Sequence, residues 1–173
     1  QAYVEALARQ LQPDPQYAAE LDELRLTRIV KAAPMHDLGK IGIRDEILLK
    51  PGRLTPTEFE EMKTHARLGS DALGRAMRRA LAMHEAQGSD SEPEAVHFLR
   101  VARTIAHWHH ERWDGKGYPD ALAGNAIPLA ARLMALADVF DALISRRVYK
   151  VPMPFDEARD AIVADFAGLV DTF

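Results

Sequence analysis

Residues 95–119 read AVHFLRVARTIAHWHHERWDGKGYP. Apolar side chains recur every three or four residues through the first part of this stretch, which predicts a helix. Two adjacent histidines, His109 and His110, close the helix, and a loop that contains Gly115 and Gly117 follows. A hydrophobic core does not require neighbouring imidazoles, whereas glycine lets a backbone turn tightly and approach another group closely. By itself the histidine pair could be a partly exposed helix end and the loop any Gly-Pro turn, so their role depends on the polar residues elsewhere in the chain.

Most of the chain outside this stretch also has the helical period. Residues 3–11, 16–40, 127–145 and 155–170 carry apolar side chains at helical spacing, and no convincing pair of strands is found. In residues 16–40 the side chains predicted to point inward are Leu21, Leu24, Ile29 and Val30. We therefore predict an all-α fold, a helical bundle.

The sequence LTPTEFEEMKTH, which ends at His65, contains a strong signal for the start of a helix. Thr55 is a good N-cap residue, Pro56 suits the first helical position, and Glu58 completes a capping box. We expect this helix to pass through His65 and to continue well beyond it. The preceding residues, 41–53, are interrupted by a Pro-Gly pair and are predicted to form a loop.

Length and composition limit the classes of protein that this chain can represent. Its 173 residues are enough for a core, and we expect a single domain over residues 1–173. The net charge of −4 argues against binding to polymeric nucleic acid. Cysteine is absent, so a metal must bind to histidine, aspartate, glutamate or water. No apolar run approaches the roughly 18 residues of a membrane span and no signal-peptide pattern is present, so we expect a cytoplasmic location.

Four of the predicted helical segments carry polar residues on faces that should be apolar. These residues are His36 with Asp37 and Lys40, then His65, then His109 with His110, and finally Asp138. Buried carboxylates are rarely left alone, because an unpaired charge is costly where the dielectric constant is low. The presence of all four groups in one helical chain favours a shared metal site over coincidence.

Adjacent residues on a helix point about 100° apart, so a His-Asp or His-His pair suits two neighbouring ions better than one. Two ions about 3.5–4 Å apart can clamp the attacking and leaving oxygens of a phosphoryl transfer. A ligand set rich in imidazole disfavours Ca²⁺ and bare Mg²⁺ and favours iron, manganese, zinc or similar ions. Single histidines are usually structural, which we expect for His84, His97 and His107, and Asp141 is more simply a salt-bridge or cap partner.

Four motifs, in this order, resemble the HD-GYP domains, a subgroup of the HD phosphohydrolase superfamily. They are HDLGK, LLKPGRLTPTEFEEMKTH, HHERWDGKGYP and IPLAARLMALADVFDALISRRVYK, and the resemblance covers about residues 1–155. The His-Asp pair alone would indicate only the superfamily, whereas the glycine signature followed by ADVFDAL indicates the subgroup. The resemblance implies a bundle of the HD-domain type with a GYP loop. It also implies a bacterial signalling enzyme that hydrolyses the second messenger cyclic di-GMP to pGpG or GMP.

The resemblance further implies which residues bind metal. The residues that match family ligands are His36, Asp37, His65, His109, His110 and Asp138, with Asp37 as the bridging carboxylate. Family members use two or three divalent ions. Iron or manganese is the first expectation for this chain, and zinc, nickel or others are alternatives. The family usually has further ligands just upstream of Gln1, so the number of ions stays open.

Other residues match positions that contact the substrate. Asp37 and Lys40 would be catalytic, with Lys40 near the phosphate or the activated water. Arg147 and Lys150 match residues that bind the phosphates, although by themselves they would be read as a solvated charge run. Lys116, Gly117 and Tyr118 would form a lip that touches either the substrate or a partner domain. Ala121 stands where glycine is common in the family.

The expected function is metal-dependent hydrolysis of cyclic di-GMP. One alternative is the same chemistry on another cyclic dinucleotide or nucleotide. A second alternative is a weakly active module that binds a diguanylate cyclase (GGDEF) domain through the GYP loop. Because the chain begins inside a helical pattern, we expect a missing upstream segment, preceded by a receiver or sensory domain. The chain could also form a homodimer.

Overall fold

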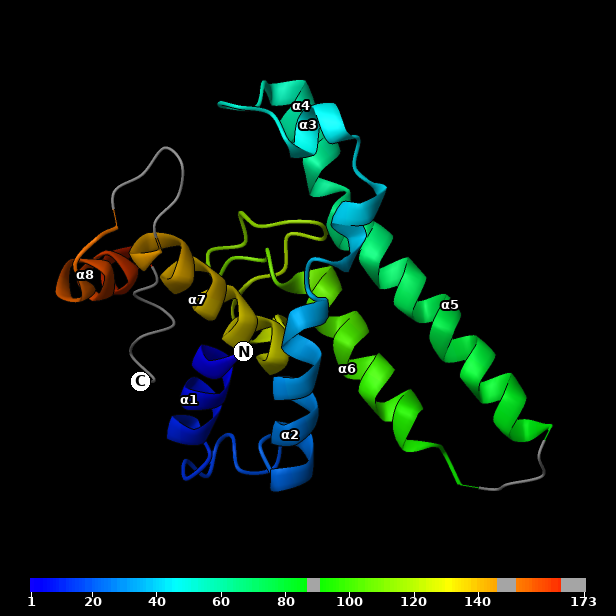
Figure 1. Cartoon of the computed structure of the whole chain (residues 1–173). Coiled ribbons are helices and arrows are strands. Elements are labelled where there is room, and N and C mark those ends of the chain that lie inside the picture. Colours follow the sequence, from blue (N-terminus) through cyan, green and yellow to red (C-terminus); the bar gives the residue numbers. More distant parts are fainter. Residues whose placement is uncertain (87–90, 146–151, 166–173) are drawn as a thin grey trace.

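This computed structural model describes residues 1–86, 91–145 and 152–165, and every regular element in these residues is helical (Figure 1). The elements are α1 Ala2–Leu11, α2 Glu23–Ala32, the 3₁₀ turns η1 Ala33–Met35 and η2 Leu38–Gly42, α3 Asp45–Leu48, α4 Pro56–Lys63, α5 His65–Glu85, α6 Glu94–Trp108, the 3₁₀ turn η3 Gly124–Ala126, α7 Leu129–Ile144 and α8 Phe155–Asp165. The predicted all-α class is confirmed. None of the described helices combines the length and the apolarity that a membrane crossing requires.

The hydrophobic core lies where five of the helices meet. Val4 of α1, Leu26 of α2, Ile105 of α6 and Leu133 of α7 are fully buried in one apolar cluster, to which Leu73 of α5 also belongs. Nearly all of the first half of α7 is buried, because α1, α6 and α8 all pack against this helix. A helix that is apolar on every side belongs in a core. Helix α7 is therefore the central helix of the bundle.

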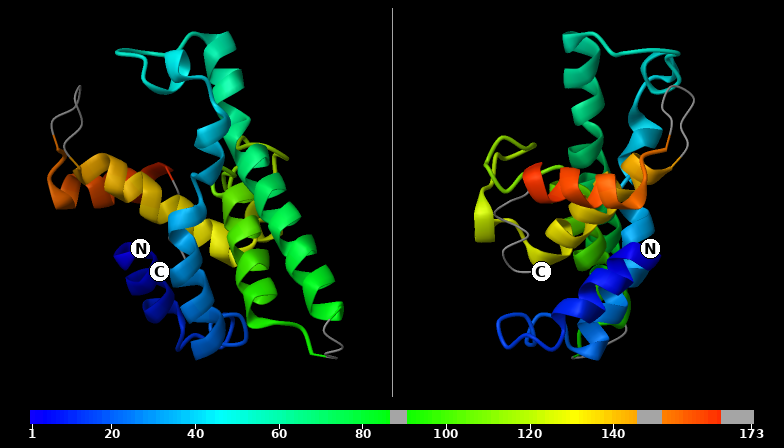
Figure 2. Two further views of the ribbon diagram at one scale, coloured as in Figure 1. Left: turned by 45° about the vertical axis from the view of Figure 1, so that its right-hand side comes forward. Right: turned by 90° about the vertical axis from the view of Figure 1, so that its left-hand side faces the viewer.

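Helices α5 and α6 form an antiparallel pair that runs along one side of the molecule (Figures 1 and 2). Helices α3 and α4 lie next to the start of α5, at the end of the molecule farthest from the start of α2. They project beyond the main bundle (Figure 1). Turn η2 packs on α5 and connects this projecting part to α2. The end of α6, the start of α5 and η2 consequently meet at the centre.

The start of α4 forms as the sequence predicts. The Thr55 side chain accepts a hydrogen bond from the backbone N–H of Glu58, and the Glu58 side chain accepts one from the backbone N–H of Thr55. Lys50 Nζ also donates to both carboxylate oxygens of Glu58, at 2.8 and 2.6 Å. The capping box is therefore confirmed, and it is anchored to the residues after α3.

Three local expectations are wrong. The helix expected to pass through His65 is divided at Thr64, whose hydroxyl donates to the Glu61 carbonyl at 2.7 Å and so competes with the regular helical hydrogen bonds. Residues 41–53 include the short helix α3 rather than only a loop. Leu24 is 55% exposed and Leu26 is buried instead, because at about 100° per residue Leu26 lies on the same side of α2 as the buried Ile29 and Leu24 lies on the opposite side.

Candidate metal centre

Segments that are far apart in the sequence meet at one point. Asp37 lies between η1 and η2, His65 is the first residue of α5, and His109 and His110 directly follow α6. Helix α6 ends at Trp108, so the histidine pair follows the helix instead of closing it as predicted. Because His110 lies beyond the regular helix, the angle between adjacent helical residues does not keep the two imidazoles apart, and both reach the same cluster.

A glycine allows η2 to approach α5 at this point. A Cβ atom on Gly39 would lie 1.9 Å from the carbonyl oxygen of His65 and 2.5 Å from the amide nitrogen of Gly69. Contacts this short do not occur, so only glycine fits here. The backbone contact places Asp37, two residues before Gly39, opposite the side chain of His65.

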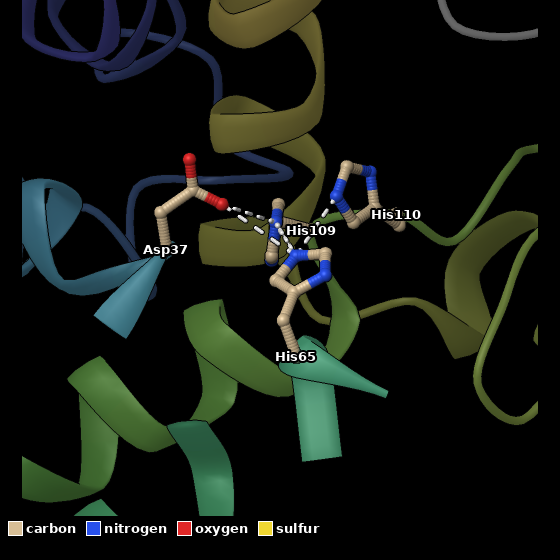
Figure 3. A group of neighbouring side chains, drawn as sticks. All are labelled: Asp37, His65, His109 and His110. Atoms are coloured by element: carbon tan, nitrogen blue, oxygen red, sulfur yellow. Dashed lines mark hydrogen bonds and ion pairs between the residues drawn. The ribbon is translucent and has the colours of Figure 1, made fainter. Parts of the chain in front are cut away.

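Asp37, His65, His109 and His110 point toward one another, and one ligand atom of each lies within 4.8 Å of the others (Figure 3). The Nε2 atom of His65 is 3.2 Å from that of His110 and 3.5 Å from that of His109. Asp37 Oδ1 is 3.5 Å from His65 Nε2 and 3.9 Å from His109 Nε2. Three imidazole nitrogens and a carboxylate oxygen therefore surround one small volume.

The facing atoms of Asp37, His65 and His109 are hydrogen-bond acceptors. His65 Nδ1 lies 2.7 Å from a backbone carbonyl oxygen of α4, and His109 Nδ1 lies 3.1 Å from one of α6. A carbonyl oxygen only accepts, so each Nδ1 carries the proton and each neutral ring presents an Nε2 lone pair to the cluster. Asp37 Oδ1 is buried and has no hydrogen-bond partner. Buried acceptors that face one another fit a bound cation, and the nitrogen-rich set suits a divalent transition metal.

Burial keeps the imidazoles of the cluster neutral. Burial and the neighbouring imidazoles lower the pKa of His109 to about 2 and that of His110 to about 3, and burial also lowers the pKa of His65. Burial by itself would raise the pKa of Asp37, but hydrogen bonds from His36 and Lys40 lower it below its usual range. At neutral pH the cluster is thus one carboxylate and three neutral imidazoles, which is the protonation state that metal binding requires.

His36 and Lys40 contact the other oxygen of the Asp37 carboxylate. Lys40 Nζ donates to Asp37 Oδ2 at 2.6 Å, and His36 Nε2 lies 3.3 Å from the same oxygen. The His36 ring meets the His109 ring edge-on, with the centroids 5.2 Å apart. His36 therefore adjoins the cluster without being one of its four members.

A cavity of about 470 Å³ opens beside the cluster. The residues predicted from the sequence that line this cavity are His109, His110, Asp138, Lys116, Gly117 and Tyr118. The Tyr118 ring stacks on His110, with centroids 4.7 Å apart and planes inclined by 28°. Burial raises the pKa of Tyr118, as do the charges of Asp37 and Asp138, so the phenol stays protonated and can donate a hydrogen bond. Asp138 faces the cavity but does not belong to the four-residue cluster.

The buried carboxylate of Glu111 orders the loop that follows the histidine pair. Glu111 is 3% exposed and accepts hydrogen bonds from the backbone N–H groups of Asp120 at 2.7 Å and Leu122 at 3.0 Å. Asp120 in turn accepts a hydrogen bond from the Trp108 indole at 3.0 Å and lies 2.9 Å from His107 Nε2. His107 therefore has the structural position expected for it. These hydrogen bonds hold the far end of the loop, at Asp120 and Leu122, against the end of α6 from which the loop starts.

The two glycines of the loop have the conformational roles that the sequence predicts. Gly115 has a φ of +74°, and a Cβ atom on Gly117 would lie 2.3 Å from the amide nitrogen of Arg112. Ala121, which stands where the resembling family commonly has glycine, adopts a φ of +55°. Alanine is unfavourable in this left-handed region because its Cβ approaches the carbonyl oxygen.

The structure thus gathers most of the predicted site residues around one centre. Arg147 and Lys150 lie outside the described residues. Two residues that line the cavity, Phe59 and Lys63, were not predicted from the sequence. Their spacing on the capped helix was the available signal, since they lie one turn apart and Lys63 precedes His65 by two residues. Glu111, expected either behind the metal ligands or on the surface, is buried, which nothing in its local sequence indicates.

Comparison with known proteins gives matches over almost the whole chain. The family model described as HD domain matches residues 2–171. A cyclic di-GMP phosphodiesterase of Vibrio cholerae serotype O1 is 50% identical over 168 residues, which are 97% of this chain and 31% of that protein. A probable cyclic di-GMP phosphodiesterase of the same organism is 49% identical over 163 residues, 94% of this chain and 34% of that protein. A 3′3′-cGAMP-specific phosphodiesterase from Vibrio cholerae is 40% identical over 144 residues, 83% of this chain and 24% of that protein.

The chain spans about a third of the length of the first two of these relatives. The match to the family model, by contrast, covers nearly every residue and includes all the segments that meet at the metal centre. The helical architecture and the grouped histidines and aspartate agree with that match. The chain belongs to the HD domain family.

Proposed function

We propose that this chain is a divalent-metal-dependent phosphodiesterase that hydrolyses cyclic di-GMP to pGpG or GMP. The observation that carries the proposal is the buried cluster of Asp37, His65, His109 and His110 at the edge of a cavity of about 470 Å³. The names of two relatives that are 50% and 49% identical to this chain support the substrate, and membership of the HD domain family supports hydrolysis.

We infer that two or three divalent ions bind, with iron or manganese first and zinc or nickel as alternatives. Asp37, His65, His109 and His110 would hold the first ion, and His36 and Asp138, which flank them, would extend the ligand set. When bound, such ions activate water near neutral pH and neutralise negative charge on a phosphate.

The remaining site residues would position the phosphate. Lys40 lies beside Asp37 Oδ2 and is 39% exposed, so its ammonium can donate to a phosphate oxygen as well as to the carboxylate. Tyr118 keeps its phenolic proton and can donate a second hydrogen bond. Lys116 and Gly117 line the same cavity, and the exposed Lys116 adds positive charge at its rim. Roles for Arg147 and Lys150 in phosphate binding are proposed from the family resemblance alone.

Replacement of Asp37 by asparagine tests the proposal. The substitution keeps the size of the side chain but removes the charge that three imidazoles cannot supply, so both bound metal and hydrolysis should fall to background. Elemental analysis and chromatographic detection of pGpG and GMP measure the two quantities. Asp141→Asn, which alters an exposed carboxylate on α7, is the matched control and should retain both. Wild-type turnover in Asp37→Asn would refute the proposal.

A related substrate is the second candidate. Three relatives are named for specificity toward 3′3′-cGAMP, although each is less similar to this chain than the two Vibrio cholerae proteins named for cyclic di-GMP. Hydrolysis rates for cyclic di-GMP, 3′3′-cGAMP and cyclic di-AMP, measured side by side with metal-loaded protein, distinguish these candidates. Binding of a diguanylate cyclase domain at the GYP loop, an upstream receiver or sensory domain, and a homodimer stay predictions.

A further inference from the structure

The wall of the cavity formed by α4 contains two residues without a role in the proposed reaction. Phe59 and Lys63 lie one helical turn apart and line the cavity together with His110, Tyr118 and Asp138. Phe59 is 45% exposed, and it is one of the residues that line the cavity. Its exposed surface is therefore open to a planar ligand in the cavity.

The ammonium group of Lys63 lies among aromatic rings. Lys63 Nζ is 5.0 Å from the centroid of the Phe59 ring and 5.6 Å from that of Tyr118. These rings meet edge to face, with centroids 6.5 Å apart, and Tyr118 itself stacks on His110. The Lys63 ammonium thus lies beside the aromatic rings of Phe59 and Tyr118 at the cavity. Lys40, by contrast, lies at the carboxylate of the metal centre, where the phosphate would bind.

The ion pair of Lys63 leaves its ammonium available. Lys63 Nζ lies 2.7 Å from Glu60 Oε1, and the Glu60 side chain is 69% exposed. An exposed pair of this kind is weak, so a ligand in the cavity can replace the carboxylate. The Lys63 side chain itself is 28% exposed, so its contacts are more shielded from water than those of Glu60.

We propose that Phe59 and Lys63 recognise guanine, with the base against Phe59 and the ammonium of Lys63 donating to guanine O6 and N7. Guanine presents two acceptors on this edge, whereas adenine presents one acceptor and an amino donor. A lysine at this position therefore favours guanine and opposes adenine. Stacking on an aromatic ring is tolerant of the base, so Phe59 contributes affinity rather than selectivity. The inference rests on the proposed function, because it names the group by which that substrate is selected.

Binding of mononucleotides tests the inference independently of turnover. Calorimetry with GMP and AMP uses ligands that contain no phosphodiester to hydrolyse, and it is performed on the whole metal-loaded protein. The wild type should prefer GMP. Lys63→Met should weaken GMP binding by about 10- to 100-fold and leave AMP binding unchanged or stronger. Lys63→Arg should retain the preference, and Phe59→Leu should weaken both nucleotides equally. Glu60→Gln removes the ion pair but keeps the ammonium, and should bind as the wild type does.

Equal weakening of GMP and AMP binding in Lys63→Met would overturn the inference, because it would indicate a phosphate contact. Unchanged binding in that variant, or a wild type without preference for GMP, would overturn it as well. The same variants assayed with cyclic di-GMP and cyclic di-AMP should change KM more than kcat. If the wild type selects GMP through Lys63 but hydrolyses neither dinucleotide, the proposed function fails while guanine recognition stands.

Discussion

Replacement of Gly39 by alanine tests whether the contact between η2 and α5 sets the geometry of the metal centre. The new Cβ would lie 1.9 Å from the His65 carbonyl oxygen, and ordinary contact begins at 3.4 Å, so the two segments must separate by about 1.5 Å. Metal sites require ligand distances within about 0.2 Å of the ideal values. Overpacking an interior costs about 1–3 kcal/mol, and we expect the upper end because the atoms in contact are backbone atoms.

The expected result is a loss of about 3 kcal/mol in the free energy of unfolding together with loss of bound metal. Urea denaturation measures the first quantity, and equilibrium dialysis with elemental analysis measures the second. Gly42→Ala is a control within the same turn, since its Cβ would meet only the side chain of Leu68, at 3.0 Å. Leu68 is 41% exposed and can move aside, so this variant should bind metal normally. The reasoning is refuted if Gly39→Ala binds metal with wild-type affinity and unfolds within about 0.5 kcal/mol of the wild type.

Ala121→Gly should stabilise the fold by about 0.5–1 kcal/mol in urea denaturation, because glycine removes the cost of a left-handed alanine and adds a smaller entropic cost; a destabilised variant would contradict this. Glu111→Gln should lower the free energy of unfolding by about 1–2 kcal/mol. The amide oxygen can accept the hydrogen bond from the backbone N–H of Asp120 or of Leu122, but the amide NH₂ group would then face the other N–H, and two donors cannot pair. An unchanged unfolding midpoint would count against the role of Glu111 in ordering the loop. Chelation of divalent ions should lower the thermal unfolding midpoint, by the equivalent of about 2.7 kcal/mol if the ion was present at 100 times its Kd. This shift should become smaller in acid, because protonated histidines no longer bind the ion. Identical midpoints with and without chelator at neutral pH would argue against a metal held by this cluster.

Features that depend on neighbours within one helical turn could be read from the sequence. The capping box of Thr55 and Glu58 formed as predicted, because both partners lie within four residues. The polar residues on apolar faces were equally visible, since the helical period defines what each position should be. Lys63 and Phe59 obeyed the same spacing, but without a cavity there was no reason to select them among other helical pairs.

Features that depend on packing could not be read in this way. Leu21 suggested that Leu24, three residues later, also points inward, but α2 begins only at Glu23, so Leu26 on the side of Ile29 is buried while Leu24 is 55% exposed. Glu111 is polar and follows two histidines, yet it is buried because the chain returns to it at Asp120 and Leu122. Ordinary sequence signals contain no information about such returns.

The sequence determines one part of the metal centre, and the tertiary structure determines the other. The identities of His36, Asp37, His65, His109, His110 and Asp138 were available from their place in a helical pattern. The way these residues group together could not be predicted from the sequence. Helix α6 ends before His109, so both imidazoles can reach one volume, and the contact at Gly39 places Asp37 opposite His65. Asp138 was left at the cavity wall and outside the four-residue cluster. A helix follows from interactions within a turn, whereas a ligand cluster requires distances of a few ångströms between segments about 30 to 70 residues apart, which only close packing of the helices establishes.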